Sequence, residues 1–161
     1  MDTERNLETI FDSELKDLLV VSYIVLCNNA VSNGYMERRF DMPVQAWSSL
    51  LAIDTFEGIR AKEIRALFPR PQNTISRAVS LLERRKLIVQ RPSETDAREK
   101  LLYITAAGRR LLDEIREVSR RRQEELFGVL TKSERRTFFA LASKIANGAS
   151  LRDSRVMSDE S

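Results

Sequence analysis

Apolar residues recur at helical spacing along most of this chain, and the pattern is clearest between Pro71 and Leu87. Ile75, Val79 and Leu82 fall on one side of the predicted helix, which gives it an apolar back. The other side carries amide, hydroxyl and guanidinium groups, on Gln72, Asn73, Thr74, Ser76, Arg77 and Arg84. These groups can meet base edges and phosphates, so this polar front is a candidate surface for nucleic acid.

A β-hairpin is predicted directly after this helix. Two short apolar runs, at 87–89 and 101–104, flank the charged loop PSETDAREK. Ile59 and Arg60 are predicted to form a strand stub that pairs with the hairpin. A short helix is predicted from Ala61 to Phe68, and the PRP sequence that follows ends it because proline cannot donate to a helical ladder. This order of elements predicts a winged helix-turn-helix.

Further helices are predicted on both sides of this lobe. Residues 1–11 are polar and expected to be partly loose, whereas 12–39 read as a long helix with a kink or an end near Gly34. The helix predicted from Pro43 to Phe56 has one apolar side, lined by Val44, Trp47, Leu50 and Leu51. Thr105 is the expected N-cap of a long helix, and the TKSE sequence at 131–134 is a capping box that opens the last one.

The terminal helices carry more apolar surface than one small lobe can cover, which predicts a two-fold homodimer. The fold class is therefore mainly α with a small β-hairpin wing. We expect an N-terminal dimerisation helix at 1–39, a winged helix-turn-helix lobe at 40–105 and C-terminal dimerisation helices at 106–150. Residues 151–161 are charged and expected to be a disordered tail.

Charge is distributed unevenly along the sequence. The whole chain has a net charge of +3, but residues 60–100 hold eleven Lys and Arg against five acidic residues, a local charge of +6. Concentrated basic charge on the predicted winged helix favours neutralisation of DNA phosphates. A solvated surface is the alternative explanation of such a charge run.

Composition argues against several other classes of protein. No run of about 18 apolar residues and no secretion signal is visible, so a cytoplasmic protein is expected. The chain has no histidine and one cysteine, Cys27, which leaves no zinc cluster and no internal disulfide. Without a phosphate loop or paired carboxylates in an apolar setting, we predict that it is not an enzyme and needs no cofactor.

Three motifs resemble the MarR (multiple antibiotic resistance regulator) family. DAREKLLYIT followed by Gly108 resembles its D-x-R-x-x-x-x-x-L-T-x-x-G wing segment, and NTISRAVSLLERRKLIVQR resembles its recognition helix and first wing strand. MPVQAWSSLLAI is similar to a third family segment. The chain departs from the family at Arg60 and Pro71, where helix caps usually stand, and at Lys86-Leu87, which lacks an intervening glycine.

The resemblance implies a transcriptional regulator, a repressor, that binds a pseudo-palindromic operator in double-stranded DNA as a homodimer. It places Arg98 in the minor groove, and we expect Asp96 to fix the shape of the wing. The predicted DNA contacts are the polar front of the helix together with wing residues, namely Gln72, Asn73, Thr74, Ser76, Arg77, Arg84, Arg91, Asp96, Arg98 and Lys100.

The resemblance also implies a pocket for a small aromatic or amphipathic effector between the dimerisation helices and the lobe. Its candidate residues are Tyr35, Arg38, Arg39, Phe40, Met42 and Trp47. Ordinary packing at a hinge would explain the same residues.

Two alternative functions stay open. The winged helix could be a protein-interaction module, although the polar front argues against it, because such a module would carry apolar or acidic groups there. The regulator could also respond to oxidants through Cys27. The nearest basic residues in sequence are Lys16 and Arg38, so a packed, unreactive thiol is expected instead.

Overall fold

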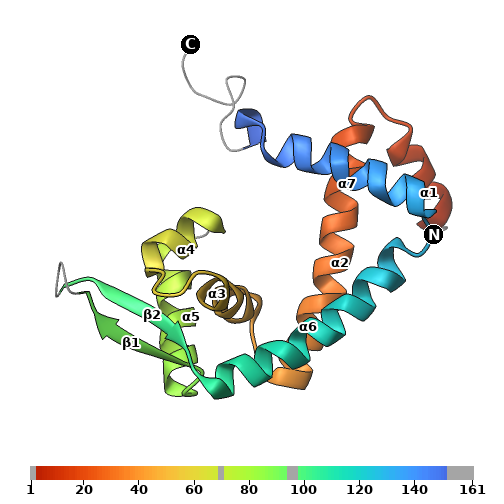
Figure 1. The fold of residues 1–161 in the computed structure, drawn as a ribbon. Coiled ribbons are helices and arrows are strands. Elements are labelled where there is room, and N and C mark those ends of the chain that lie inside the picture. Colours follow the sequence, from red (N-terminus) through yellow and green to blue (C-terminus); the bar gives the residue numbers. More distant parts are fainter. Residues whose placement is uncertain (1–2, 69–70, 94–97, 152–161) are drawn as a thin grey trace, which may run out of the picture. The chain divides into compact units, whose positions relative to one another are not determined.

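The computed structural model describes residues 3–68, 71–93 and 98–151, and it is mainly helical (Figure 1). Its elements are α1 (Thr3–Phe11), α2 (Lys16–Phe40), α3 (Val44–Thr55), α4 (Ala61–Leu67), α5 (Gln72–Arg84), β1 (Ile88–Pro92), β2 (Lys100–Ile104), α6 (Ala106–Phe127), α7 (Lys132–Ala146) and a 3-10 turn (Ala149–Leu151). The predicted fold class is confirmed. The chain forms two compact units, residues 1–115 and 116–161.

The core of the first unit lies where α3, α4, α5 and the hairpin meet. Its central side chains are at most 2% exposed and include Leu50, Ile53, Ile64, Ile75, Leu82, Ile88 and Leu102. The apolar back predicted for α5 is therefore confirmed. Burying such aliphatic side chains contributes about 1.5–3 kcal/mol each relative to leaving them exposed, so this cluster fixes which face of α5 remains outside.

The buried face of α3 differs from the predicted one. Val44, Trp47 and Leu51 are only partly buried, whereas Ala46 and Ser49 are completely covered. Small side chains let α3 approach its neighbours closely, and α3 contacts both α5 and β2. The Ser49 hydroxyl donates to the Gln45 carbonyl at 2.7 Å, so its burial leaves no unsatisfied donor. A pattern of large apolar residues could not reveal this face.

The helix-turn-helix consists of α4 and α5. Ile64 is buried, whereas Leu67 is 41% exposed because α4 ends at this residue. Pro71 is the N-cap of α5, with an extended ψ of 143°. Pro69, the other proline of the predicted break, lies outside the described residues.

The hairpin pairs its strands in antiparallel register from Ile88 opposite Ile104 to Pro92 opposite Lys100. Ile59 adds an isolated bridge to Leu102, which confirms the predicted strand stub. The Gly58 amide donates to the Leu102 carbonyl at 3.1 Å, and the Leu102 amide donates to the Ile59 carbonyl at 3.1 Å. The wing is thus attached at its base to the segment that opens α4.

The junction between the hairpin and α6 depends on Thr105 and Gly108. The Thr105 hydroxyl donates to the Lys86 carbonyl at 2.8 Å and accepts from the Gly108 amide at 3.0 Å, which confirms the predicted N-cap. A Cβ on Gly108 would lie 2.1 Å from the Leu87 carbonyl oxygen. The T-x-x-G spacing therefore lets the first turn of α6 lie directly on the backbone that leaves α5.

Lys86 stands where the family motif has a glycine, and it adopts the backbone conformation that a glycine would adopt there. Its φ is 58°, in the left-handed region, and the Leu87 amide donates back to the Leu82 carbonyl at 2.9 Å. For a residue with a Cβ this conformation costs about 1–2 kcal/mol. The departure from the family motif is thus accommodated by the backbone of Lys86 and leaves the turn intact.

The N-terminal region is more helical than predicted. Residues expected to be loose form α1, and the edge-to-face contact of Phe11 with Tyr23, at 5.4 Å between ring centroids, holds it on α2. The expected break near Gly34 is also absent, since α2 is one helix of 25 residues. Within it, the Ser32 hydroxyl donates to the Asn28 side chain at 3.3 Å, so these polar residues bond to one another along the helix.

Helix α2 exposes most of its apolar side chains within the single chain. Leu18 is 72% exposed, Leu26 67% and Val21 60%. Among the described residues it is also the one helix long and apolar enough to cross a membrane, by length and composition only. Asn28, Asn29 and other polar residues near its middle make a lipid environment costly.

The second compact unit contains the C-terminal part of α6 and α7. Phe127, Phe138 and Phe139 pack edge to face or tilted, with ring centroids 4.9–5.9 Å apart. The predicted capping box is present, because the Thr131 amide donates to the Glu134 carboxylate at 2.8 Å and the Glu134 amide donates to the Thr131 hydroxyl at 3.3 Å. Helix α7 buries none of its residues within the chain.

The contact of Gly108 with Leu87 predicts that Gly108→Ala lowers the free energy of unfolding by about 3 kcal/mol, because either the strand or α6 must shift to admit a methyl group. Denaturant unfolding measures the change. Gly34→Ala is the matched control, since its Cβ would meet only the flexible end of Arg38, at 3.1 Å. That substitution should stabilise α2 by about 0.5–1 kcal/mol. Equal effects at the two positions would contradict this explanation.

Candidate nucleic-acid interface

The front of α5 is exposed and polar, as its sequence predicts. Asn73, Ser76, Arg77 and Arg84 are exposed and Thr74 is partly exposed, while Ala78 on the opposite side is buried. The Ser76 hydroxyl donates to the Asn73 carbonyl at 3.1 Å. Gln72 opens the helix, but its side chain is not among those described. The tertiary structure therefore presents the predicted contact residues on one open face.

An open cleft of about 680 Å³ follows this face of α5. It is bordered by the start of α3 and by one side of the recognition helix, through Pro43, Gln45, Thr74, Ser76, Arg77, Ala78, Ser80, Leu81 and Arg84. Two guanidinium groups and three hydroxyl groups border it, together with the apolar side chains of Pro43, Ala78 and Leu81. The two guanidinium groups suit an anionic partner.

A smaller cleft of about 160 Å³ lies between α4 and α5. Lys62 and Arg65 of α4 line it together with Ile75 and Ser76 of α5. These two basic residues contribute to the local charge of 60–100 but are not among the DNA contacts predicted from the sequence. Their spacing of three residues, which places both on one face of a short helix, is the feature of the sequence that could have indicated this shared surface.

The wing presents three of its predicted contact residues. Arg98 is exposed beside the loop, and Lys100 is exposed at the start of β2. At the base of the loop, the Ser93 amide donates to the Glu99 carbonyl at 2.9 Å. Asp96 lies outside the described residues. Arg91 is exposed, and its guanidinium carbon lies 4.8 Å from the centroid of the Tyr103 ring, which orients that side chain along the sheet.

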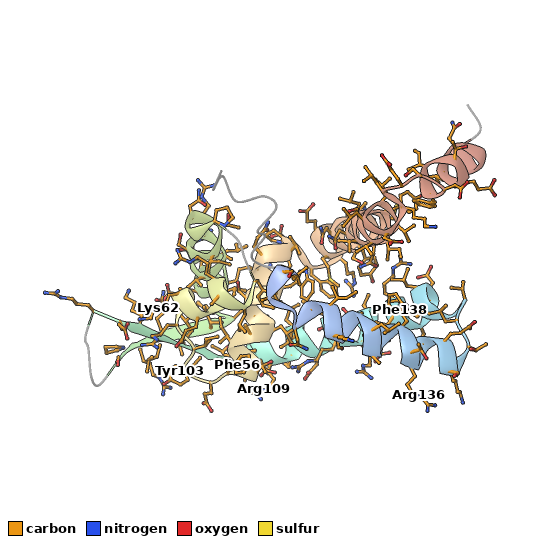
Figure 2. All side chains as sticks on the ribbon, turned by 90° about the horizontal axis from the view of Figure 1, so that it is seen from above. Phe56, Lys62, Tyr103, Arg109, Arg136 and Phe138 are labelled. Carbon is orange, nitrogen blue, oxygen red and sulfur yellow. The ribbon has the colours of Figure 1, made fainter. Side chains whose placement is uncertain are left out.

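A cluster of four charged residues joins α4 to the wing, and we call it the wing ion cluster: Arg60, Lys62, Glu63 and Glu99. The Glu63 carboxylate accepts from the backbone amide of Arg60 at 2.8 Å and from its guanidinium at 2.6 Å. Glu99 accepts from the same guanidinium at 2.6 Å and from the ammonium of Lys62, which projects from α4 toward the hairpin (Figure 2).

The wing ion cluster explains why arginine is tolerated where the family usually has a hydroxyl cap. A guanidinium has no acceptor, so it cannot cap the amides of α4. Glu63 instead satisfies the Arg60 amide from inside the first turn. Both interactions with Arg60 lower the pKa of Glu63 to about 2. Hydrogen bonds from Lys62 and Arg60 likewise hold the pKa of Glu99 below its usual value.

The residues predicted to form an effector pocket lie near the end of α2 and the start of α3. Phe40 and Met42 are buried, Tyr35 packs against Phe40 with 6.2 Å between ring centroids, and the Arg39 guanidinium lies 5.6 Å from the same ring. Arg38 is exposed and lies over Gly34, so it is separate from this aromatic group. Neither of the two clefts described above is lined by these residues.

Trp47 and Arg85 have particular environments in this region. The indole nitrogen of Trp47 is buried, and no acceptor for it exists among the described residues. Arg85, at the end of α5, donates to the Phe40 carbonyl at 3.0 Å and the Asp41 carbonyl at 2.8 Å. It thereby joins the end of α2 to the end of the recognition helix, a connection that sequence analysis missed.

Cys27 is exposed on α2, which corrects the expectation of a packed thiol. Its hydrogen bond with the Tyr23 hydroxyl, one turn earlier, raises the pKa of Tyr23.

Comparison with known proteins gives the same interpretation of the fold. Residues 40–99 match the model of the MarR family. The matched segment, which contains the helix-turn-helix, is thus similar to the MarR family. No curated protein matches its sequence.

Several solved structures share this MarR-type fold. A crystal structure of MarR is 27% identical, with a TM-score of 0.72 over 84% of this chain and 90% of that one. BldR from Sulfolobus solfataricus is 21% identical, with a TM-score of 0.72 over 84% and 96% of the two chains. A Listeria monocytogenes protein assigned to MarR-family transcriptional regulators and complexed with a 26mer DNA is 20% identical, with a TM-score of 0.70 over 84% and 87%. The family and these neighbours are transcriptional regulators rather than enzymes.

The role of Glu63 in this MarR-type lobe predicts a pH-dependent effect of Glu63→Gln. Because the folded state lowers the pKa of Glu63 from 4.5 to about 2, its contribution is fully present above about pH 5 and is lost as the pH falls toward 2. At pH 7 the variant should melt about 1–3 °C lower, as expected for losing one capping interaction.

Thermal melts of both proteins from pH 7 to pH 2 measure this difference. The difference in melting temperature between the wild-type protein and Glu63→Gln should close as the pH falls. Glu57→Gln, at an exposed acidic residue in the preceding turn, should show no such gap. A gap that persists at pH 2 would contradict a role for the ionised carboxylate.

Proposed function

We propose that this MarR-family protein is a sequence-specific DNA-binding transcriptional regulator, a repressor, that acts on a pseudo-palindromic operator in the cytoplasm. The observation that carries the proposal is the polar face of α5, which has Thr74, Ser76 and Arg77 along an open cleft. A helix with a buried apolar back and such a front can enter a major groove and present its side chains to base edges. The Listeria monocytogenes neighbour is complexed with a 26mer DNA, which supports DNA as the partner.

The wing supplies a second kind of contact in this proposal. Arg98 is exposed beside the loop, and a guanidinium in a minor groove responds to groove width and potential rather than to a unique base pattern. Arg84, Arg91 and Lys100 are proposed phosphate contacts, because they are exposed and basic on the same lobe. Gln72 and Asp96 remain proposed participants on the basis of the sequence motif.

We propose that the regulator is a homodimer. Helix α2 exposes Leu18 and Leu26, and α7 exposes Leu141 and Ile145 by 58% and 64%. Extended apolar surface of this kind is uncommon on a soluble monomer and marks an interface. A second copy is the economical partner, since two-fold symmetry covers both surfaces at once and presents two α5 helices to half-sites about 10 bp apart.

An effector site is a further part of this proposal. The aromatic group of Tyr35 and Phe40, with Arg39 beside it, suits a small aromatic or amphipathic anion. Arg85 connects the end of α2 to the end of α5, so a ligand that moves this group has a physical route to the recognition helix.

Two substitutions separate the proposed roles of helix and wing. An operator is first selected from a pool of random double-stranded DNA. Arg77→Ala should change which base is preferred at defined operator positions, at about 1–3 kcal/mol of discrimination per lost base contact. Arg98→Ala should weaken binding to many sequences and relax the preference for A·T-rich flanks. Affinities measured across a library of single-substitution operators test both.

The two variants also serve as controls for each other, because each removes one positive charge. Uniform loss of affinity in Arg77→Ala, with unchanged base preference, would contradict a major-groove role. Failure of the wild-type chain to select any sequence would favour the alternative of a protein-interaction module.

The proposed dimer predicts a sedimenting species of twice the 18.6 kDa chain mass at micromolar concentration. Leu26→Glu should lower the dimer fraction strongly, because it places a charge in the apolar surface of α2. Asn6→Asp, at an exposed position of α1, adds one negative charge as a control and should leave the dimer intact. A folded monomer in the wild-type protein would overturn the two-half-site arrangement.

A further inference from the structure

Glu99 has an unusual position in the wing. It lies between Arg98 and Lys100, both exposed and basic, yet its own side chain is only 28% exposed. Its carboxylate turns back to α4 and binds Arg60 through one oxygen and Lys62 through the other. One acidic side chain of the wing is therefore held by two cations from a different element.

The backbone of Glu99 is also fixed. Its carbonyl accepts from the Ser93 amide at 2.9 Å across the base of the loop. The bridge between Ile59 and Leu102 attaches the wing at its base, three residues further along β2. Glu99 adds a second attachment nearer to the loop. Two attachments at different heights along the hairpin restrict the angle between the hairpin and α4, whereas a single attachment would leave that angle free.

The charges of the wing ion cluster balance, with two cations and two carboxylates at its four positions. Arg60 is shared between Glu63 and Glu99, at 2.6 Å from each. An isolated exposed ion pair contributes little, but two pairs that share one guanidinium, each through a different nitrogen, constrain one another's geometry. The lowered pKa of Glu99 is in keeping with this arrangement.

We propose that Glu99 is a positioning residue that holds the wing against α4 and thereby fixes the direction of Arg98. Consecutive Cα atoms are about 3.8 Å apart, so fixing residue 99 leaves Arg98 a short range of positions. Glu99 also neutralises Lys62 and Arg60, which lowers the attraction of this face for DNA of any sequence. The positioning effect raises the ratio of operator to random-DNA affinity, whereas the charge effect lowers both affinities together. The inference rests on the proposed DNA-binding function.

The first arm of the test uses no DNA. Backbone amide order parameters are measured by nuclear magnetic resonance for the full chain, for Glu99→Gln and for Glu57→Gln, which removes the same charge from a turn outside the cluster. In Glu99→Gln, the order parameters of residues 98–100 should fall from about 0.85 toward about 0.6. Glu57→Gln should leave them unchanged. Unchanged wing order in Glu99→Gln would overturn the proposal.

The second arm measures affinity for the selected operator and for a random duplex of equal length. Glu99→Gln should bind the random duplex more tightly and lose about fivefold in the ratio of the two affinities, a size in keeping with an exposed ion-pair network. If Glu99 acted through its charge alone, both affinities would rise together and the ratio would stay constant. That parallel rise would overturn the positioning role.

A double-mutant cycle completes the design. Lys62→Gln removes one partner of Glu99 and leaves Arg60 paired, so wing order should fall less than in Glu99→Gln. Combining Lys62→Gln with Glu99→Gln should lower wing order no further than Glu99→Gln alone, and an additive loss would count against the pair. If the wild-type protein prefers no sequence at all, the proposed function fails, while the first arm still decides whether Glu99 holds the wing.

Discussion

The burial of one side of α5 is the constraint on which the rest of the structure depends. Ile75 and Leu82 are at most 2% exposed and are surrounded by α3, α4 and the hairpin, so the helix cannot rotate without exposing them. The same packing forces Asn73 and Arg77 outward. The surface proposed to contact DNA is therefore a direct consequence of the hydrophobic core, since a helix has only one way to bury a single apolar stripe.

Close backbone contacts then place the wing relative to that helix. Gly108 lets α6 lie on the Leu87 carbonyl, and Thr105 bonds to the carbonyl of Lys86 in the turn that leaves α5. Lys86 accepts a left-handed backbone to make this turn. Both ends of the hairpin are consequently anchored to one another at the end of α5. Movement of the recognition helix and of the wing base must be coupled, because they share these hydrogen bonds.

Charge has two separate uses in this lobe. Arg77, Arg84 and Lys100 are exposed and suited to phosphate and base contacts, whereas Arg60 and Lys62 are neutralised within the wing ion cluster. Because the wing ion cluster holds two cations and two carboxylates, the net local charge of +6 is carried entirely by residues outside the cluster. The cluster therefore contributes to the structure of the lobe without changing its net charge.

The sequence by itself determined the helix-turn-helix, the two faces of α5 and the caps at Thr105 and Thr131, because each depends mainly on local periodicity or on hydrogen bonds between near neighbours. Only the tertiary structure decided the buried face of α3, which packs through Ala46 and Ser49, and the continuity of α2 through Gly34. It also decided that Glu99 pairs with Arg60, 39 residues away, and that Arg85 joins α2 to α5. Contacts between distant residues follow from how elements pack, and a one-dimensional pattern of apolar and polar positions does not contain them.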